Sequence, residues 1–130
     1  MASEGYLGMG KGFNALLGVT YIGMQDTGYW IEIEAGDEHV HDLGLVHGGV
    51  ILSLLDIAMS RAVRHGLEAH IYMPTIEINA SFLRPINRGV VRTCGTVKRM
   101  SKSLARVEGE VFDAQGRGCA IGRATFISPH

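Results

Sequence analysis

The segment Gly48–His65, GGVILSLLDIAMSRAVRH, constrains the fold more than any other part of this sequence. On a helical wheel its apolar side chains point in nearly every direction. The residues that break this apolar surface share one narrow arc: Gly49, Ser53, Asp56, Ser60 and Arg64. A helix that is apolar almost all round is a buried helix. We therefore expect a sheet to wrap this helix and a partner to cover what the sheet leaves open.

Alternation of apolar and polar residues predicts strands on both sides of this helix. We expect strands at residues 19–25, 28–35, 75–83, 90–98, 103–112 and 118–127, and a short helix at 12–18. The last two strands carry small residues at alternate positions, Ala105, Gly109, Ala120, Gly122 and Ala124, which let a sheet approach a helix closely. Two strands, one long helix and four further strands predict an α+β domain with a curved antiparallel sheet.

Length and charge narrow the classes of function. The 130 residues fit a single domain, 1–130, in which we expect residues 1–11 to be mobile. The net charge of −1 offers no basic footprint for nucleic acid. The apolar runs are too short to cross a bilayer, and no export-signal pattern opens the sequence, so we expect a cytoplasmic protein with no membrane partner. Cys94 and Cys119 are expected to be free thiols.

The start of the long helix and Asp56 are the features that suggest chemistry. The first N–H groups of a helix lack partners inside it and suit a developing negative charge. Gly48 and Gly49 have no side chains that would keep a substrate carbonyl away. Asp56 lies eight residues after Gly48, or ~12 Å along the helix axis. If both groups serve one reaction, they must come from two helices, as in a two-fold dimer with two sites at its interface.

A short pattern resembles a known family. Gly44 and the run His47-Gly48-Gly49, with Asp56 nine residues after the histidine and SFLRPINRG further on, resemble the hotdog-fold acyl-CoA thioesterases. The PaaI-like, or phenylacetyl-CoA, branch is the most similar, and the resemblance covers residues 13–127. It implies a hotdog fold, in which a curved antiparallel sheet of five to six strands wraps the central helix. It also implies homodimers that pair into tetramers, an acyl-CoA substrate and no cofactor.

The resemblance also implies roles for individual residues. Asp56 would be the nucleophile or the general base that activates water, and the Gly48 N–H would polarise the thioester carbonyl. His47 would hold the helix start, and Thr75 would position the water or the acid. One residue departs from the family: His41 stands where Asn or Gln is common, beside the substrate carbonyl. A neutral imidazole can also donate one hydrogen bond, but it titrates near neutral pH.

The remaining expectations concern binding. Gly49 and Ser60 are expected to contact the substrate, because they share the polar arc of Asp56. Basic residues in two turns are candidates for the phosphates of CoA: Arg84, Arg88, Arg99 and Lys102. A group of potential metal ligands, Asp37, His39, His41 and Asp42, matches no recognised zinc spacing, so we expect no metal.

Three alternative functions stay open at this point. The chain could be an acyl-CoA-binding hotdog protein without catalysis, a hotdog dehydratase or hydratase, or a purely structural dimer module. Hydrolysis is favoured because Asp56 argues against a non-catalytic protein, and its spacing from His47-Gly48-Gly49 resembles the dehydratase branch less. One carboxylate and one oxyanion site are sufficient for hydrolysis, since a thiolate leaves readily.

Overall fold

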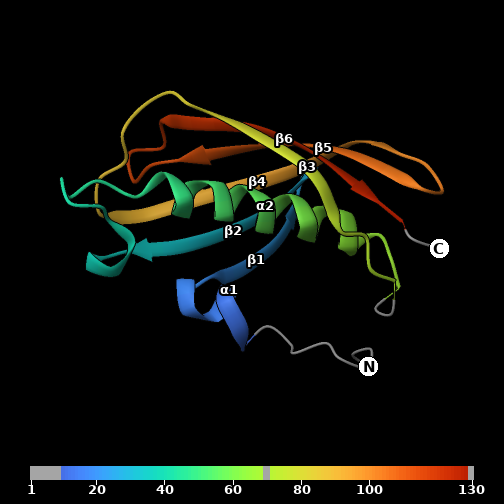
Figure 1. Cartoon of the computed structure of the whole chain (residues 1–130), viewed down its shortest axis with the longest axis horizontal. Helices are drawn as coiled ribbons and strands as arrows, with labels where there is room; N and C mark the ends of the chain where they lie inside the picture. Colours follow the sequence, from blue (N-terminus) through green and yellow to red (C-terminus); the bar gives the residue numbers. More distant parts are fainter. Residues whose placement is uncertain (1–9, 69–70, 129–130) are drawn as a thin grey trace.

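The computed structural model describes residues 10–68 and 71–128, so most of the N-terminal segment expected to be mobile lies outside the described residues. Six strands form one antiparallel sheet that curves over one long helix (Figure 1). The elements are α1 (Gly12–Leu17), β1 (Thr20–Gln25), β2 (Gly28–Ala35), the 3₁₀ turn η1 (Asp37–His39), α2 (Gly48–His65), β3 (Thr75–Phe82), β4 (Gly89–Met100), β5 (Leu104–Phe112) and β6 (Gly118–Ile127). This order confirms the predicted α+β class and the hotdog architecture.

The strand order in the sheet is β1-β2-β4-β5-β6-β3, and every neighbouring pair is antiparallel. The chain leaves β2 near one edge, runs through α2 across the concave face, and returns as β3 at the opposite edge. β1 and β3 are therefore the two edge strands. The sheet does not cover the side of α2 that lies between these two edges. This is the side that carries the polar arc.

The core lies between α2 and the inner face of the sheet. Leu54, Leu55, Ala58 and Met59 are completely buried, which confirms that α2 is a buried helix. Small strand residues make this close approach possible. A Cβ atom added to Gly109 or Gly122 would lie only 3.0 or 3.1 Å from the Leu55 side chain, and one added to Gly95 would lie 2.6 Å from the Met59 Cα atom.

Burial follows the predicted alternation in β2 but not at the ends of β3. Tyr29, Ile31 and Ile33 are buried on one face of β2, as predicted. On β3, Ile76 and Phe82 are 55% and 54% exposed, although the alternation groups them with core-facing residues. Ile76 lies where the register between β3 and β6 is irregular, and β3 is an edge strand with no further strand beyond it in the described part of the chain. The edge of the sheet next to the polar arc therefore presents apolar side chains to the exterior.

Both cysteines are free thiols, as predicted: Cys94 is half-buried and Cys119 is buried. Burial is the largest factor that raises the pKa of each thiol. Across the described ranges, none of the helices is sufficiently long and apolar to span a membrane.

Candidate active site

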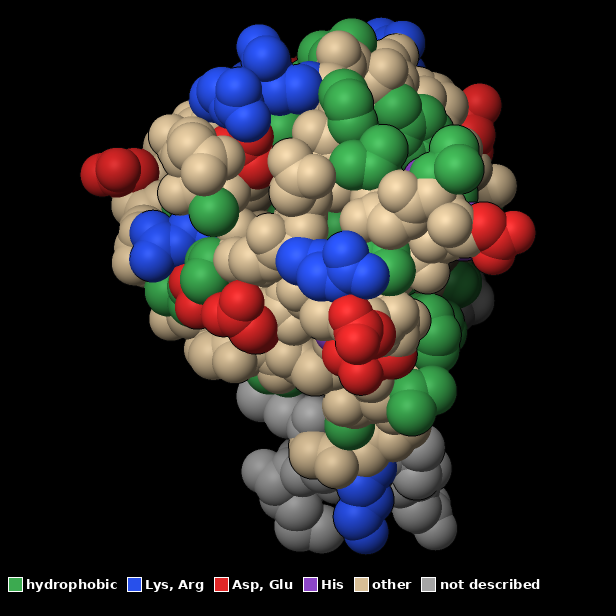
Figure 2. All heavy atoms as spheres, turned by 90° about the vertical axis from the view of Figure 1, so that its left-hand side faces the viewer, with side chains coloured by type: hydrophobic (Ala, Val, Ile, Leu, Met, Phe, Trp, Pro, Cys, Tyr) green, Lys and Arg blue, Asp and Glu red, His purple; other side chains and the backbone are tan. Residues whose placement is uncertain are grey.

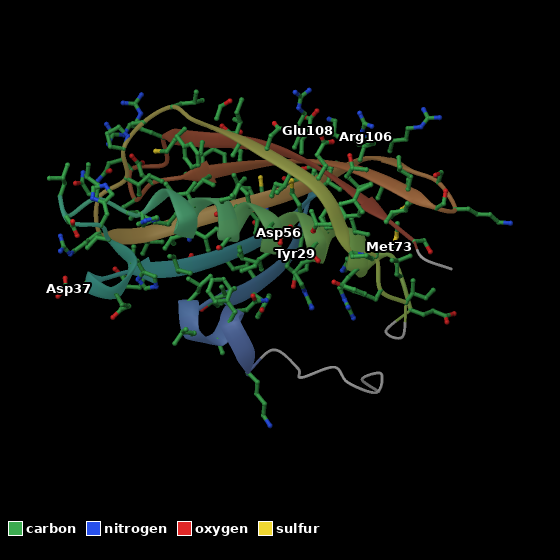
Figure 3. The ribbon with its side chains drawn as sticks, in the orientation of Figure 1. Tyr29, Asp37, Asp56, Met73, Arg106 and Glu108 are labelled. Atoms are coloured by element: carbon green, nitrogen blue, oxygen red, sulfur yellow. The ribbon has the colours of Figure 1, made fainter. Side chains whose placement is uncertain are left out.

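Asp56 projects from the middle of α2 (Figure 3), and the first residue of β3 holds its side chain. The Thr75 hydroxyl donates a hydrogen bond of 2.7 Å to Asp56 Oδ1. Both side chains are half-buried and line a hollow of about 410 Å³ together with Ser53 and Ile76. Among the described residues no group donates to Asp56 Oδ2, so this oxygen remains available to a water molecule or a substrate.

The start of α2 offers one free backbone donor. His47 is the N-cap residue, and its Nδ1 atom accepts a hydrogen bond of 2.7 Å from the Gly49 N–H. The N–H groups of Val50 and Ile51 both donate to the His47 carbonyl, at 2.9 and 3.2 Å. Within residues 10–68 and 71–128 nothing accepts from the Gly48 N–H. Gly48 is therefore the one donor of the first turn left for a substrate, whereas the Gly49 N–H is already occupied.

His41 lies beside this free donor. His41 and Gly48 line a hollow of about 270 Å³ with Phe82 and Arg84. The Leu43 N–H donates to His41 Nδ1 at 3.0 Å, so the proton of a neutral His41 ring resides on Nε2. His41 therefore keeps one imidazole N–H as a potential donor, as the side-chain amide of an Asn or Gln would.

The loop before α2 is fixed by contacts that position the helix start. Gly44 turns this loop with a φ of 83°, a value that favours glycine. The Arg88 guanidinium donates to the Gly44 carbonyl at 3.3 Å and to Asp37 Oδ1 at 2.8 Å. Arg88, expected to meet a CoA phosphate, is thus engaged in holding the loop.

His39 holds the same loop from the inside, a role that the sequence analysis missed. Its side chain is buried, Nδ1 accepts from the Gly36 N–H at 2.9 Å, and Nε2 donates to the Leu17 carbonyl at 2.8 Å. The His39 carbonyl in turn accepts from the His47 N–H at 2.9 Å. This chain of bonds connects α1 to the start of α2.

The other expected binding residues do not converge in one chain. Arg84 lies at the helix start with Gly48, and Ser60 is half-buried one turn after Asp56. Arg99 and Lys102 belong to the β4–β5 hairpin, and Lys102 borders a hollow with Leu67, beyond the C-terminal end of α2. Figure 2, which views the end of the molecule that holds the helix start, shows acidic and basic side chains interspersed there.

The potential metal ligands do not gather into a site. Asp37 is paired with Arg88, and both ring nitrogens of His39 are engaged by the backbone. In the described part of the chain, no three His, Cys, Asp or Glu side chains lie close enough to hold an ion together.

A hotdog domain with a tethered carboxylate in its central helix and a free N–H at the helix start is equipped for chemistry at a carbonyl group. The model of the Thioesterase superfamily matches residues 43–120, and the chain belongs to this superfamily. Its class is therefore that of the thioester hydrolases.

Individual relatives agree with this class. A protein from Bacillus halodurans, crystallised with CoA, has a TM-score of 0.83 and 26% identity, covering 89% of this chain and 77% of that one. The PaaI protein of Escherichia coli, from the phenylacetic acid degradation operon, shares the fold with a TM-score of 0.79 at 19% identity, covering 89% and 83%. A Haemophilus influenzae protein with a provisional esterase name is 25% identical over 113 residues, or 83% of this chain and 82% of its own.

Proposed function

We propose that this protein hydrolyses acyl-CoA thioesters to a free acid and CoA, with Asp56 as nucleophile or general base. The observation that carries the proposal is the pairing of a tethered Asp56 carboxylate with a single free donor, the Gly48 N–H, in a thioesterase fold. The attacking atom is an oxygen of Asp56 or of a water molecule that Asp56 activates. As this oxygen attacks the carbonyl carbon, the Gly48 N–H stabilises the negative charge on the carbonyl oxygen. The C–S bond then breaks and the thiolate departs, which requires no strong general acid.

The proposed site needs two copies of the chain. Gly48 and Asp56 are separated by ~12 Å along one rigid helix, too far to act on the same carbonyl. The exposed edge of β3 supports a dimer in which the second copy supplies the Gly48 N–H that faces Asp56. Pairing β3 with β3 of the second copy would bury Ile76 and Phe82 and bring the two α2 helices together in antiparallel orientation. Gly48 of one subunit would then face Asp56 of the other.

CoA is the proposed thiol carrier, supported by the CoA bound to the Bacillus halodurans relative. Arg84 is the best placed of the four basic candidates, because it lines the hollow that contains Gly48. A guanidinium there can form charge-assisted hydrogen bonds with a phosphate. His41 would add its Nε2–H as a second donor to the carbonyl. The pairing of dimers into tetramers and the cytoplasmic location stay predictions.

The decisive experiment measures thiol release from a panel of acyl-CoA substrates. Asp56→Asn keeps the shape of the side chain and should lower kcat by about 10²–10⁴, the usual contribution of a positioned general base. Asp26→Asn is the matched control: Asp26 sits in an exposed turn with a φ of 55°, where asparagine is equally accommodated. Unchanged thiol release from Asp56→Asn would refute the proposal. Tight acyl-CoA binding without any thiol release would favour the non-catalytic alternative.

A further inference from the structure

A large apolar hollow of about 810 Å³ lies beyond the C-terminal end of α2, and the proposed mechanism does not use it. Its apolar wall consists of Leu67, Ile71, Met73 and Met100, and this wall with its rim is called here the tail pocket. We propose that the tail pocket receives the end of an aliphatic acyl chain, so that the substrates are medium-chain acyl-CoA thioesters. This inference rests on the proposed function, because it takes Asp56 as the position of the thioester.

The tail pocket begins close to Asp56. Met73 precedes Thr75, which binds Asp56, by two residues, or ~7 Å of extended chain. Along α2, Asp56 is followed on the same face by Ser60 and Arg64, and the helix ends at His65, ~14 Å away. Figure 3 shows Met73 beyond Asp56 in the direction of this helix end. In this proposal an acyl chain starts at Asp56 and follows α2 past Ser60 and Arg64 toward the tail pocket.

The distance selects a chain length. An extended alkyl chain of ~10 to 12 carbons covers ~14 Å, because each C–C bond of ~1.5 Å advances a zigzag chain by somewhat less than its length. A butyryl group would end before the tail pocket, and so would a phenylacetyl group. Each methylene that enters an apolar wall is removed from water, which strengthens binding about fourfold.

The composition of the tail pocket favours an alkyl chain over a charged ligand. The volume is within the usual range for small-molecule sites, and two of the four wall residues are methionines, whose flexible thioethers adapt to a sliding chain. The polar rim consists of Ser101, Lys102, Ser103 and Ser128. Ser101, Lys102 and Ser103 are exposed to solvent, so they remain hydrated and do not require an anionic partner.

The test compares two methionines of nearly equal exposure. Met100, 43% exposed, lines the tail pocket, whereas Met24, 40% exposed, lies on β1 and does not. The ligands are the non-hydrolysable thioethers S-butyl-CoA and S-dodecyl-CoA, with affinity measured by calorimetry. We expect S-dodecyl-CoA to bind about 250-fold more tightly than S-butyl-CoA, as four buried methylenes at about fourfold each would give. Met100→Trp should weaken S-dodecyl-CoA binding about tenfold and leave S-butyl-CoA unchanged, while Met24→Trp should change neither.

Two results would overturn the inference: equal affinity for the two thioethers, or an equal loss of both in a Met100→Trp variant that melts like the unmodified protein. Should Met100→Trp fail to fold, Ile71→Trp fills the tail pocket from another wall residue. Binding of thioethers involves no chemistry, so the two proposals separate. Chain-length-dependent binding without thiol release would refute hydrolysis alone, and thiol release with no dependence on chain length would refute the tail pocket alone.

Discussion

Replacing Gly48 by proline removes the proposed oxyanion donor and almost nothing else. Proline has no N–H, and the first residue of a helix is the position that tolerates it best. His47, which would precede the proline, already has φ −62° and ψ 137°, the extended conformation that proline requires of its neighbour. A Cβ atom at position 48 would lie 3.8 Å from the Phe82 ring, an ordinary contact. The helix should therefore form as before.

The expected loss follows from the single hydrogen bond removed. Deleting one donor of an oxyanion site costs about 2.7–4 kcal/mol in the transition state, or about 10²–10³ in kcat. Gly48→Ala is the control, because it adds the same Cβ atom and keeps the N–H; any loss in Gly48→Ala measures crowding of the substrate carbonyl by that Cβ atom, and kcat of Gly48→Pro should be lower than that of Gly48→Ala by about 10²–10³. The assay is thiol release at saturating acyl-CoA, with circular dichroism melts to verify folding. Equal rates for Gly48→Pro and Gly48→Ala would refute the role of the Gly48 N–H.

The same variant tests whether the site is shared between subunits. Gly48→Pro and Asp56→Asn are each expected to be inactive alone. When they are unfolded and refolded together, half of the dimers should be mixed, and each mixed dimer should contain one site with both native groups. Thiol release should then recover to roughly a quarter of the unmodified rate, as expected for random pairing in a two-fold dimer. Mixed dimers without activity would show that the two groups do not meet across the interface.

Three further outcomes follow from local contacts. Gly95→Ala should destabilise the protein by about 3 kcal/mol or more in urea unfolding, because its Cβ would lie 2.6 Å from the Met59 Cα atom. His41→Asn keeps an N–H donor and should retain most of the thiol release, whereas His41→Ala removes the donor and should lower thiol release further; equal rates for the two variants would exclude His41 as a donor. Burial raises the pKa of Asp113, but hydrogen bonds from Arg117 outweigh it and hold the pKa below its ordinary 3.8. The ionised carboxylate therefore stabilises the fold above pH 3.8, and this contribution is lost as the pH falls through the lower pKa that Asp113 has in the folded state. Tm of Asp113→Asn should therefore decline less steeply at acidic pH than Tm of the unmodified protein.

The elements that could be predicted are those whose signals are local. The bounds of α2 follow from the sequence because the apolar period, the glycine pair at its start and Gly66 after its end all agree. The close packing of β5 and β6 against α2 was also predictable, because small residues at alternate positions of a strand indicate that a helix lies directly under the sheet. The close contact between Gly95 and α2 could not be predicted, because a single glycine among β-branched residues forms no alternating pattern. A Cβ atom on Gly95 would lie 2.6 Å from the Met59 Cα atom.

Burial on β3 could not be predicted in the same way. Alternation assigns a side chain to a face, but it does not reveal whether anything covers that face. Ile76 and Phe82 share their face with Ile78 and Ala80, yet they lie near the ends of an edge strand and are more than half exposed. The position of a strand within a sheet depends on contacts between distant segments, and those leave no local signal.

In the candidate site, too, one distance could be predicted from the sequence and one hydrogen bond could not. The ~12 Å between Gly48 and Asp56 could be derived from the sequence because the rise of a helix is independent of its surroundings. The residues alone do not choose between Gly48 and Gly49 as donor, although the family resemblance implies Gly48, because the choice depends on the rotamer with which His47 accepts from the Gly49 N–H. If both groups serve one reaction, the sequence therefore predicts a second subunit, and the family resemblance predicts Gly48 as the donor. The hydrogen bonds of the folded helix start agree with that prediction, because they occupy the Gly49 N–H and leave the Gly48 N–H without an acceptor among the described residues.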